Sequence, residues 1–496
     1  MAKLWLLSTG LVCLAWIINE NISPKKPPFV NWDASLYFTH DSEEGLWLLP
    51  NVSLGYPEPG TLYPSNILLP TTKEEIVHMV KSALVPTSND VRAIDRRHKI
   101  KVIGSGHSWS RVAVSDDLQM SLNNYKGLVS INRELHQVTV RGGTTFNELN
   151  RILDDNGLAM SVLGSISEQT VAGAISTGTH GTGITFGNYA SMVTRLELVT
   201  GKGDILFLSA NENPEIFKAA GVSIGLLGVI SEVTFQCEPA FNLREVLYNM
   251  KLSDCLKEMA DTAQRSEHVK WWVEIHSDVC AVFEINRTTE APRDNPNHQV
   301  ETILNYGFEN ICNIVSWIPS STHAMFKLMF TYLVPTPPHD RVDKSYLVFN
   351  IPHYFPIHYE GEIVVSVEDC PATVMEVHRL VHEEGLLLNY VVEVRVVKGD
   401  DMWLSPNYQR DSCHLTMCIY NPTIKRRLNY YKKLYEAVAK FNPRFHWGKY
   451  FDLTPADMEK MYPRFKDFLK IRSQLDPSGL FLNEQLAGTF GLKHLL

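Results

Sequence analysis

In the first half of the chain, segments whose apolar residues recur at helical spacing alternate with short segments typical of strands. This pattern predicts a mixed structure of helices and strands. The polar segment at residues 71–75 (TTKEE) is followed by apolar residues at helical spacing, namely Ile76, Met79, Val80 and Ala83. Thr before the first turn and Glu within it are typical of a helix N-terminus. A second helix is expected over residues 145–153, ending by Gly157. Strands are expected at residues 101–103, 138–141, 195–200 and 204–208, the last two as a hairpin.

Residues 241–430 have a different pattern, with few glycines and β-branched runs such as 362–367 and 391–397. This pattern is interpreted as a separate α+β domain. Leu428 to Phe441 predicts an amphipathic helix. The predicted organisation is a signal peptide or anchor at 1–20, an irregular extension at 21–60, a mixed domain at 61–240, the second domain at 241–430 and a C-terminal segment at 431–496.

The first twenty residues have the pattern of a targeting segment. Lys3 precedes an apolar run from Leu4 to Ile18, which matches the core of a signal peptide and is short for a membrane span. A signal anchor and a buried N-terminal helix are the alternatives. Glycosylation sequons begin at Asn21, Asn51 and Asn286. The sequence therefore favours a secretory route to the lumen or membrane of the endoplasmic reticulum, with secretion as the alternative.

A second apolar stretch occupies residues 311–334, and its Pro, Ser, His and Lys residues argue against a spanning helix. It is interpreted either as an amphipathic helix that associates with a membrane surface or as a core helix under a loop.

Composition narrows the class of protein. The 496 residues carry 46 Lys and Arg against 55 Asp and Glu, a net charge of −9, which disfavours a protein that binds nucleic acid through its phosphates. Hydrophobic residues make up 44% and charged residues 20%, so a folded core is expected rather than disorder. No two of the eight cysteines are spaced as Cys-x-x-Cys, so no metal site is predicted, and disulfide pairing stays open.

Two clusters of glycine indicate a bound cofactor. The first follows a short strand and runs Gly104-Ser105-Gly106-His107-Ser108-Trp109-Ser110. Glycines let backbone N–H groups converge on an anion or approach a flat ring, although the third glycine of a dinucleotide-binding fingerprint is missing. Taken alone, His107 favours a turn histidine bonded to the backbone. The second cluster extends from Gly164 to Gly183, and its small polar residues suit a long polar ligand better than a packed core.

Polar residues also interrupt the apolar C-terminal strands. Glu393 and Arg395 lie two residues apart in a run of valines, which places both on one face of a strand. Either an ion pair on a solvated face or a lined cavity fits this spacing. The segment His446-Trp447-Gly448-Lys449 fits either a turn with a core tryptophan or a site that needs a fixed cation.

The order of these segments resembles the sugar-lactone oxidase branch of the vanillyl-alcohol-oxidase-type FAD enzymes. The likeness spans residues 60–490, is clearest to the L-gulonolactone oxidases, and is carried by GSGHSWS, GSISEQTVAGAISTGTHGTG, VEVR, QRDSC and HWGK. It implies an α+β fold, with a two-subdomain FAD-binding domain of the PCMH type and an α+β cap domain whose antiparallel sheet binds substrate. It also implies that His107 carries FAD covalently through the 8α-methyl group.

The resemblance further assigns roles to individual residues. It implies cofactor contacts at Gly104, Ser105, Gly106, His107, Ser108, Gly164, Ser165, Thr170, Gly173, Thr177, Gly178, His180, Ile230 and His446. It implies catalysis by Glu393, Arg395 and Lys449, and substrate contacts from these three together with Ser165 and Thr416. Members that use oxygen carry Gly where Gly164 stands, which favours an oxidase.

The implied reaction transfers a hydride from C2 of an aldono-1,4-lactone, L-gulono-1,4-lactone above all, to flavin N5. Oxygen then becomes hydrogen peroxide, and the product is L-ascorbate or an analogue. Arg395 and Lys449 would supply positive charge near the flavin, and Glu393 would orient the hydroxyl or accept its proton. The alternatives are an alditol or D-arabinono-1,4-lactone oxidase, a lactone dehydrogenase with another acceptor, and a non-catalytic flavin-fold binder.

A motif of a different enzyme class is also present. Gly221 to Gly225 fits the G-x-S-x-G elbow of serine hydrolases. That elbow follows a strand and opens a helix, whereas here a helix is predicted before it and a strand after it. The sequence therefore disfavours a hydrolase.

Overall fold

The structure is a computed structural model that describes residues 66–85, 98–115, 117–276, 278–293, 339–350, 358–386, 388, 390–420 and 424–496. It also describes Ala324 and the two short strands β1 (Thr39–His40) and β2 (Trp47–Leu48). The predicted targeting segment, the first two sequons and, Ala324 apart, the stretch at 311–334 lie outside these residues. Among the described residues, no helix combines the length and apolar character that crossing a bilayer requires.

Two sheets form the glycine-rich first half within the described ranges. The smaller one is parallel, in the order β3 (Asn66–Leu68), β5 (Leu118–Ser121) and β4 (Ile100–Ile103). The larger one is antiparallel, in the order β10 (Ile205–Ser209), β9 (Val193–Thr200), β11 (Gly228–Gln236), β7 (Gln137–Arg141) and β6 (Leu128–Asn132). Short strands β8 (Leu158–Ala159) and β12 (Glu238–Pro239) pair beside them. These strands confirm the predicted hairpin and the predicted strands at 101–103 and 138–141.

The helices described in this half are α2 (Lys73–Ala83), α3 (Phe146–Asp155), α4 (Val171–Ser176) and α5 (Pro214–Ala220). Helices α2, α3 and α5 begin where the sequence predicts, whereas α4 lies within the second glycine cluster and was not predicted. Thr72 caps α2 by accepting a hydrogen bond from the Glu75 N–H at 3.2 Å, and Thr145 and Glu148 form a capping box on α3. A cap of this kind stabilises a helix by about 1 kcal/mol. The Gly221–Gly225 segment lies between α5 and β11, so the helix-before-strand order is confirmed and opposite to a nucleophile elbow.

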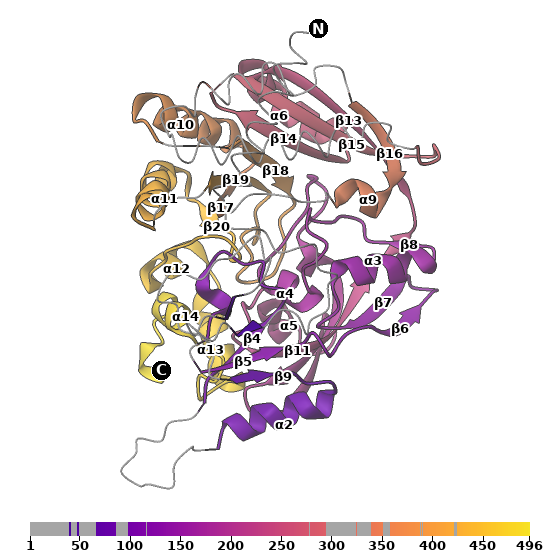
Figure 1. Ribbon diagram of the computed structural model, residues 1–496, viewed down its shortest axis with the longest axis vertical. Helices are drawn as coiled ribbons and strands as arrows, with labels where there is room; N and C mark the ends of the chain where they lie inside the picture. Colours follow the sequence, from indigo (N-terminus) through magenta and orange to yellow (C-terminus); the bar gives the residue numbers. More distant parts are fainter. Residues whose placement is uncertain are drawn as a thin grey trace.

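One large antiparallel sheet dominates the second half of the described chain. Its strand order is β16 (His339–Lys344), β13 (Asn242–Lys251), β15 (Val279–Thr288), β14 (His268–Glu274), β18 (Val392–Val397), β19 (Ser412–Tyr420), β17 (His358–Ser366) and β20 (Arg444–Phe445). Helices α6 (Leu252–Arg265) and α10 (Cys370–Glu383) cover its outer face, as Figure 1 shows. Helices α9 (Ser345–Phe349) and α11 (Ile424–Val438) lie at its margins. The predicted α+β fold with an antiparallel sheet is confirmed.

The two faces of the large sheet differ in chemistry because side chains alternate along each strand. On β18, Val392, Val394 and Val396 are at most 1% exposed and belong to the core, while Glu393 and Arg395 point to the other face. The strand register places polar residues of the neighbouring strands on that second face. We call this face the polar face; it carries Lys270, Trp272, Glu362, Glu393, Arg395, His414 and Thr416.

Two disulfides fasten the helices to the outer face. Cys255 on α6 bonds to Cys280 on β15, and Cys370 on α10 bonds to Cys413 on β19. The sequence left these pairings open, because spacing along the chain does not show which cysteines meet across a sheet.

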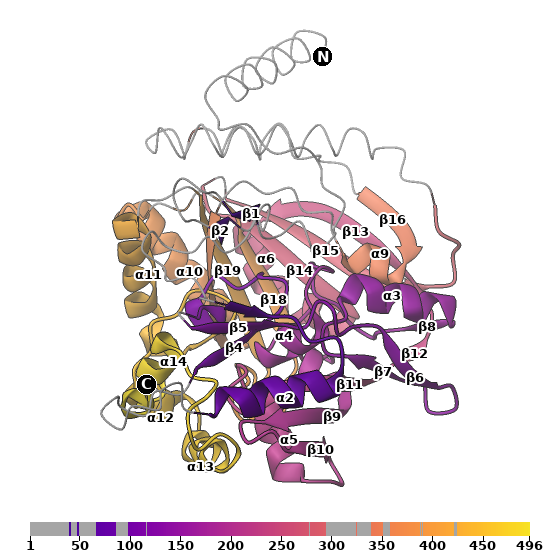
Figure 2. The ribbon, with the colours of Figure 1, turned by 60° about the horizontal axis from the view of Figure 1, so that its bottom comes forward.

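The C-terminal helices return to the first half of the molecule (Figure 2). They are α12 (Pro455–Met461), α13 (Phe465–Leu475) and α14 (Glu484–Thr489). The Ile100 N–H donates to the Leu480 carbonyl at 2.8 Å, and Leu480 and Phe481 are buried against the core beneath α2. The buried Lys101 ammonium donates to the Ile224 carbonyl at 3.1 Å. The chain end therefore closes the parallel sheet.

Candidate active site

The two glycine clusters of the sequence meet in space. A side chain on Gly104 would collide with the Thr170 hydroxyl, and its Cβ would lie 3.8 Å from the Gly173 Cα. A Cβ on Gly173 would in turn lie 2.9 Å from the same hydroxyl oxygen. Only glycine at both positions permits this approach. The first loop and the start of α4 thus present their backbones side by side, with Ser105 half-buried in that loop.

His107 stands out in this region because its ring has no polar partner. Both ring nitrogens are shielded from solvent, and neither has a hydrogen bond within the described structure. Burial lowers the pKa of His107 to about 4, so the ring is neutral near pH 7. The expectation of a turn histidine bonded to the backbone, drawn from His107 alone, is therefore wrong. A neutral imidazole whose ring nitrogens are shielded and unpartnered has a free lone pair, which is what a ligand or a covalent attachment needs.

The loop around His107 lies against the C-terminal segment that contains His446 and Lys449. The Trp109 N–H donates to the Gly448 carbonyl at 2.6 Å, and the Ser110 hydroxyl donates to the Trp447 carbonyl at 2.7 Å. Ser108 lies close to Gly448. The C-terminal segment is also joined to the large sheet, because its strand β20 pairs with β17. The His107 loop, the C-terminal segment and the large sheet therefore meet at one place.

Glu393 and Arg395 form an ion pair on the polar face, at 2.8 Å between Nη2 and Oε2. Arg395 also donates to the Ser165 hydroxyl at 2.7 Å, which joins the sheet to the second glycine cluster. The Trp272 indole N–H donates to Glu393 at 3.3 Å. Burial raises the pKa of Glu393, but Arg395, Lys270 and the two hydrogen bonds outweigh it, so the pKa lies below its usual value and the carboxylate is ionised. The solvated ion pair considered as the alternative is excluded, since these side chains are only 14% and 17% exposed.

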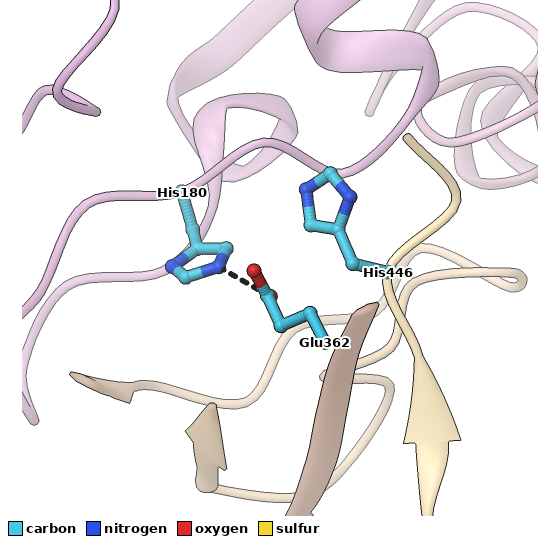
Figure 3. A group of neighbouring side chains, drawn as sticks. All are labelled: His180, Glu362 and His446. Carbon is cyan, nitrogen blue, oxygen red and sulfur yellow. Dashed lines mark hydrogen bonds and ion pairs between the residues drawn. The ribbon is translucent and has the colours of Figure 1, made fainter. Parts of the chain in front are cut away.

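A second polar group surrounds Glu362 (Figure 3). Its carboxylate lies 2.9 Å from the His180 Nε2, 2.8 Å from the His414 Nδ1, and 2.9 Å from the Thr416 hydroxyl, which donates to it. One nitrogen or oxygen atom from each of His180, Glu362 and His446 lies within 4.8 Å of the others. The His446 Nδ1 accepts a hydrogen bond from the Gly448 N–H at 3.0 Å. His180, Thr416 and His446, three predicted site residues, are therefore neighbours.

Lys449 occupies the same region and forms an ion pair with Glu360, two residues before Glu362 on β17. Burial lowers the pKa of Lys449 to about 7, while the carboxylate of Glu360 favours its charged form. The ammonium is thus a positive charge that can be lost at mildly alkaline pH.

Most of the remaining predicted residues shape the backbone of the two glycine clusters. The Gly164 N–H donates to the Tyr189 hydroxyl at 2.6 Å. Thr177 donates to the Gly173 carbonyl at 3.2 Å at the end of α4. Gly106 and Gly178 adopt the left-handed conformation, with φ of +75° and +72°. Ile230 is buried in the hydrophobic core on β11, rather than on the polar face.

Sequence reasoning missed several residues of this site. Glu362, His414, Trp272 and Lys270 were not identified, although each is buried or half-buried on the polar face. A signal was present, because Glu360 and Glu362, and His414 and Thr416, repeat the two-residue spacing of Glu393 and Arg395 in apolar runs.

Comparisons with known proteins show the family to which the chain belongs. Residues 233–488 match the family model described as D-arabinono-1,4-lactone oxidase, and residues 64–209 match a model described as FAD binding domain. The chain is 32% identical to the L-gulonolactone oxidase of Bos taurus, over 86% of this chain and 95% of that protein. It is 28% identical to the L-gulono-1,4-lactone dehydrogenase of Mycobacterium tuberculosis, over 86% and 96%.

A solved structure shows the same fold. The cholesterol oxidase from B. sterolicum superposes with a TM-score of 0.67 at 16% identity, covering 85% of this chain and 93% of that one. The family matches, the relative and the shared fold together place the chain: it belongs to the aldonolactone oxidase branch of the PCMH-type FAD-dependent oxidoreductases.

Proposed function

We propose that the protein oxidises the C2 hydroxyl of L-gulono-1,4-lactone, with FAD attached to His107 and oxygen as the acceptor. FAD-dependent oxidation of an aldonolactone follows from the family. The observation that carries the proposal is the junction of Glu393, Arg395 and Ser165, which brings an ionised carboxylate and a guanidinium to the glycine-rich loops.

The residues present fit FAD. The backbones of the two glycine clusters approach each other closely, which suits a cofactor with a pyrophosphate and a flat ring. The unpartnered ring nitrogens of His107 provide an attachment point in the same loop. When bound, FAD supplies an acceptor for the hydride and a route for the electrons to oxygen.

The polar face accounts for the chain's own part in the reaction. Glu393 is held ionised and oriented by Arg395 and Trp272, so it can accept a hydrogen bond, and then the proton, from the substrate hydroxyl. The guanidinium of Arg395 and the ammonium of Lys449 are donors for the oxygens of a lactone. Both groups are positioned before substrate arrives, so in their charged forms they stabilise developing negative charge without reorganisation.

Turnover of a substrate panel tests the proposed function. We expect peroxide release with L-gulono-1,4-lactone to exceed that with D-arabinono-1,4-lactone and with alditols. A dye acceptor distinguishes an oxidase from a dehydrogenase, which is the class of the mycobacterial relative. Reduction of the dye without release of peroxide would indicate a dehydrogenase. If neither peroxide nor reduced dye forms with any aldonolactone or alditol, the proposed function is wrong.

Covalent attachment at His107 predicts a colour that survives denaturation. Acid precipitation of the wild-type protein should leave the flavin in the pellet, whereas the pellet of His107→Ala should release it. His446→Ala is the matched control, because this imidazole is also buried with a pKa lowered to about 4, yet it accepts a hydrogen bond from Gly448. Free flavin from the wild-type protein, or bound colour in His107→Ala, would contradict the assignment.

A secretory location is also proposed, with attachment to the membrane through residues 1–20. Two disulfides on the outer face of the sheet are typical of an oxidising compartment, and the apolar run after Lys3 supports the same route. Expression of the full chain in animal cells tests it: a mobility shift on treatment with an N-glycosidase is expected, and fractionation with cytosolic markers would refute it.

A further inference from the structure

Glu362 is the most heavily bonded group of the site, and the reaction described above does not use it. Its side chain is 4% exposed and accepts hydrogen bonds from residues on both halves of the molecule. Burial alone raises its pKa, but His446, His180 and the hydrogen bonds from His180 and His414 bring it well below the usual value. A buried carboxylate that stays ionised needs a matching positive charge.

The hydrogen bonds of His180 show where that charge lies. Its Nδ1 is 2.8 Å from the Gly181 carbonyl oxygen and its Nε2 is 2.9 Å from Glu362 Oε1. A carbonyl oxygen and a carboxylate oxygen only accept hydrogen bonds, so both ring nitrogens of His180 must donate. That requires the doubly protonated imidazolium.

His414 also bonds to Glu362, but as a neutral imidazole. Burial and the nearby His180 lower its pKa to about 3, so His414 is neutral and donates its Nδ1 proton to Glu362. Its Nε2 lies 2.9 Å from the Asn407 side-chain oxygen. Turning this amide by 180° exchanges that oxygen with the buried, unpartnered Nδ2, so that Asn407 donates to the bare Nε2 of a neutral His414. The single charge of Glu362 is therefore matched by the single charge of His180.

We propose that Glu362 is a positioning residue that holds His180 as an imidazolium and ties the second glycine cluster to strands β17 and β19. The consequence is a fixed positive charge in the loop next to Gly178 and Gly181, where the cofactor is expected. The other groups with charge or titratable protons around this pair are Arg395 on β18, His446 after β20, His414 on β19 and Tyr435 on α11.

The proposal is tested by ring-nitrogen NMR of the flavin-loaded protein labelled with 15N-histidine. The His180 signals are identified by their loss in His180→Gln. In the wild-type protein, both ring nitrogens of His180 should be protonated at pH 7, because each faces an acceptor oxygen. One protonated and one bare nitrogen at pH 7 would overturn the proposal, and this outcome does not depend on any variant folding or turning over substrate.

The variant Glu362→Gln tests whether Glu362 is the group that holds the second ring proton on His180. With the anion removed, His180 should carry one ring proton under the same conditions, and Glu362→Asp should restore part of the doubly protonated signal. Glu245→Gln is the matched control, since Glu245 is 8% exposed on the same sheet but is not bonded to His180; it should leave the His180 signals unchanged. A doubly protonated His180 in Glu362→Gln would show that another group holds the proton and would refute the role of Glu362.

Discussion

Glu393→Gln is expected to lower kcat for the lactone by roughly 10²- to 10⁴-fold, the range of a positioned general base. The amide has nearly the same shape, yet it accepts a proton far more weakly and no longer balances Arg395 at 2.8 Å. KM should change less than kcat, because the carboxylate acts most strongly on the proton that leaves during the reaction. Steady-state peroxide release, normalised to bound flavin, measures both constants.

Two variants separate this loss from damage to the fold. Glu245→Gln removes a buried carboxylate from β13, which β15 and β14 separate from β18 in the same sheet, and should retain kcat within about threefold. Trp272→Phe removes the indole hydrogen bond to Glu393 while keeping an aromatic ring, and should give an intermediate loss. If Glu393→Gln keeps near wild-type kcat with full flavin content, the carboxylate is neither the base nor the group that orients the hydroxyl.

Lys449→Met is expected to lower kcat/KM by about 10²- to 10³-fold, the cost of removing one preorganised donor or charge from a buried site. The pH dependence gives a sharper test. Burial lowers the pKa of Lys449 to about 7, so the ammonium is charged below that pH and neutral above it. If the charged form is the active one, wild-type kcat/KM should fall as the pH rises through about 7.

Lys449→Arg distinguishes charge from shape. Arginine stays protonated throughout, so this variant should lose the alkaline fall even where its absolute rate is lower. Lys432→Met is the control, because Lys432 is 74% exposed on α11 and should leave the profile unchanged. A rate that rises through pH 7 in the wild-type protein would contradict the proposed role and indicate that neutral Lys449 acts as a base.

Local patterns predicted much of the fold correctly. The Thr72 and Thr145 caps, the β9–β10 hairpin and the valine run of β18 are set by residues within a few positions of one another, so spacing alone identifies them. The glycine clusters and the pair Glu393 and Arg395 were visible for the same reason. The two-residue spacing of Glu393 and Arg395 showed that both side chains share one face of a strand, but not what covers that face.

The partners of the site residues depended on contacts across the sheet and between the two halves of the chain. Glu362 meets His180 across 182 positions and Arg395 meets Ser165 across 230, and no local pattern records such distances. Disulfide pairing was open for the same reason. The sequence by itself determined which strands and loops form and which residue types the chemistry has available. Only the tertiary structure decided which charges face each other, because burial and strand register, rather than residue identity, leave His107 unpartnered, lower the pKa of Lys449 and join Glu362 to His180.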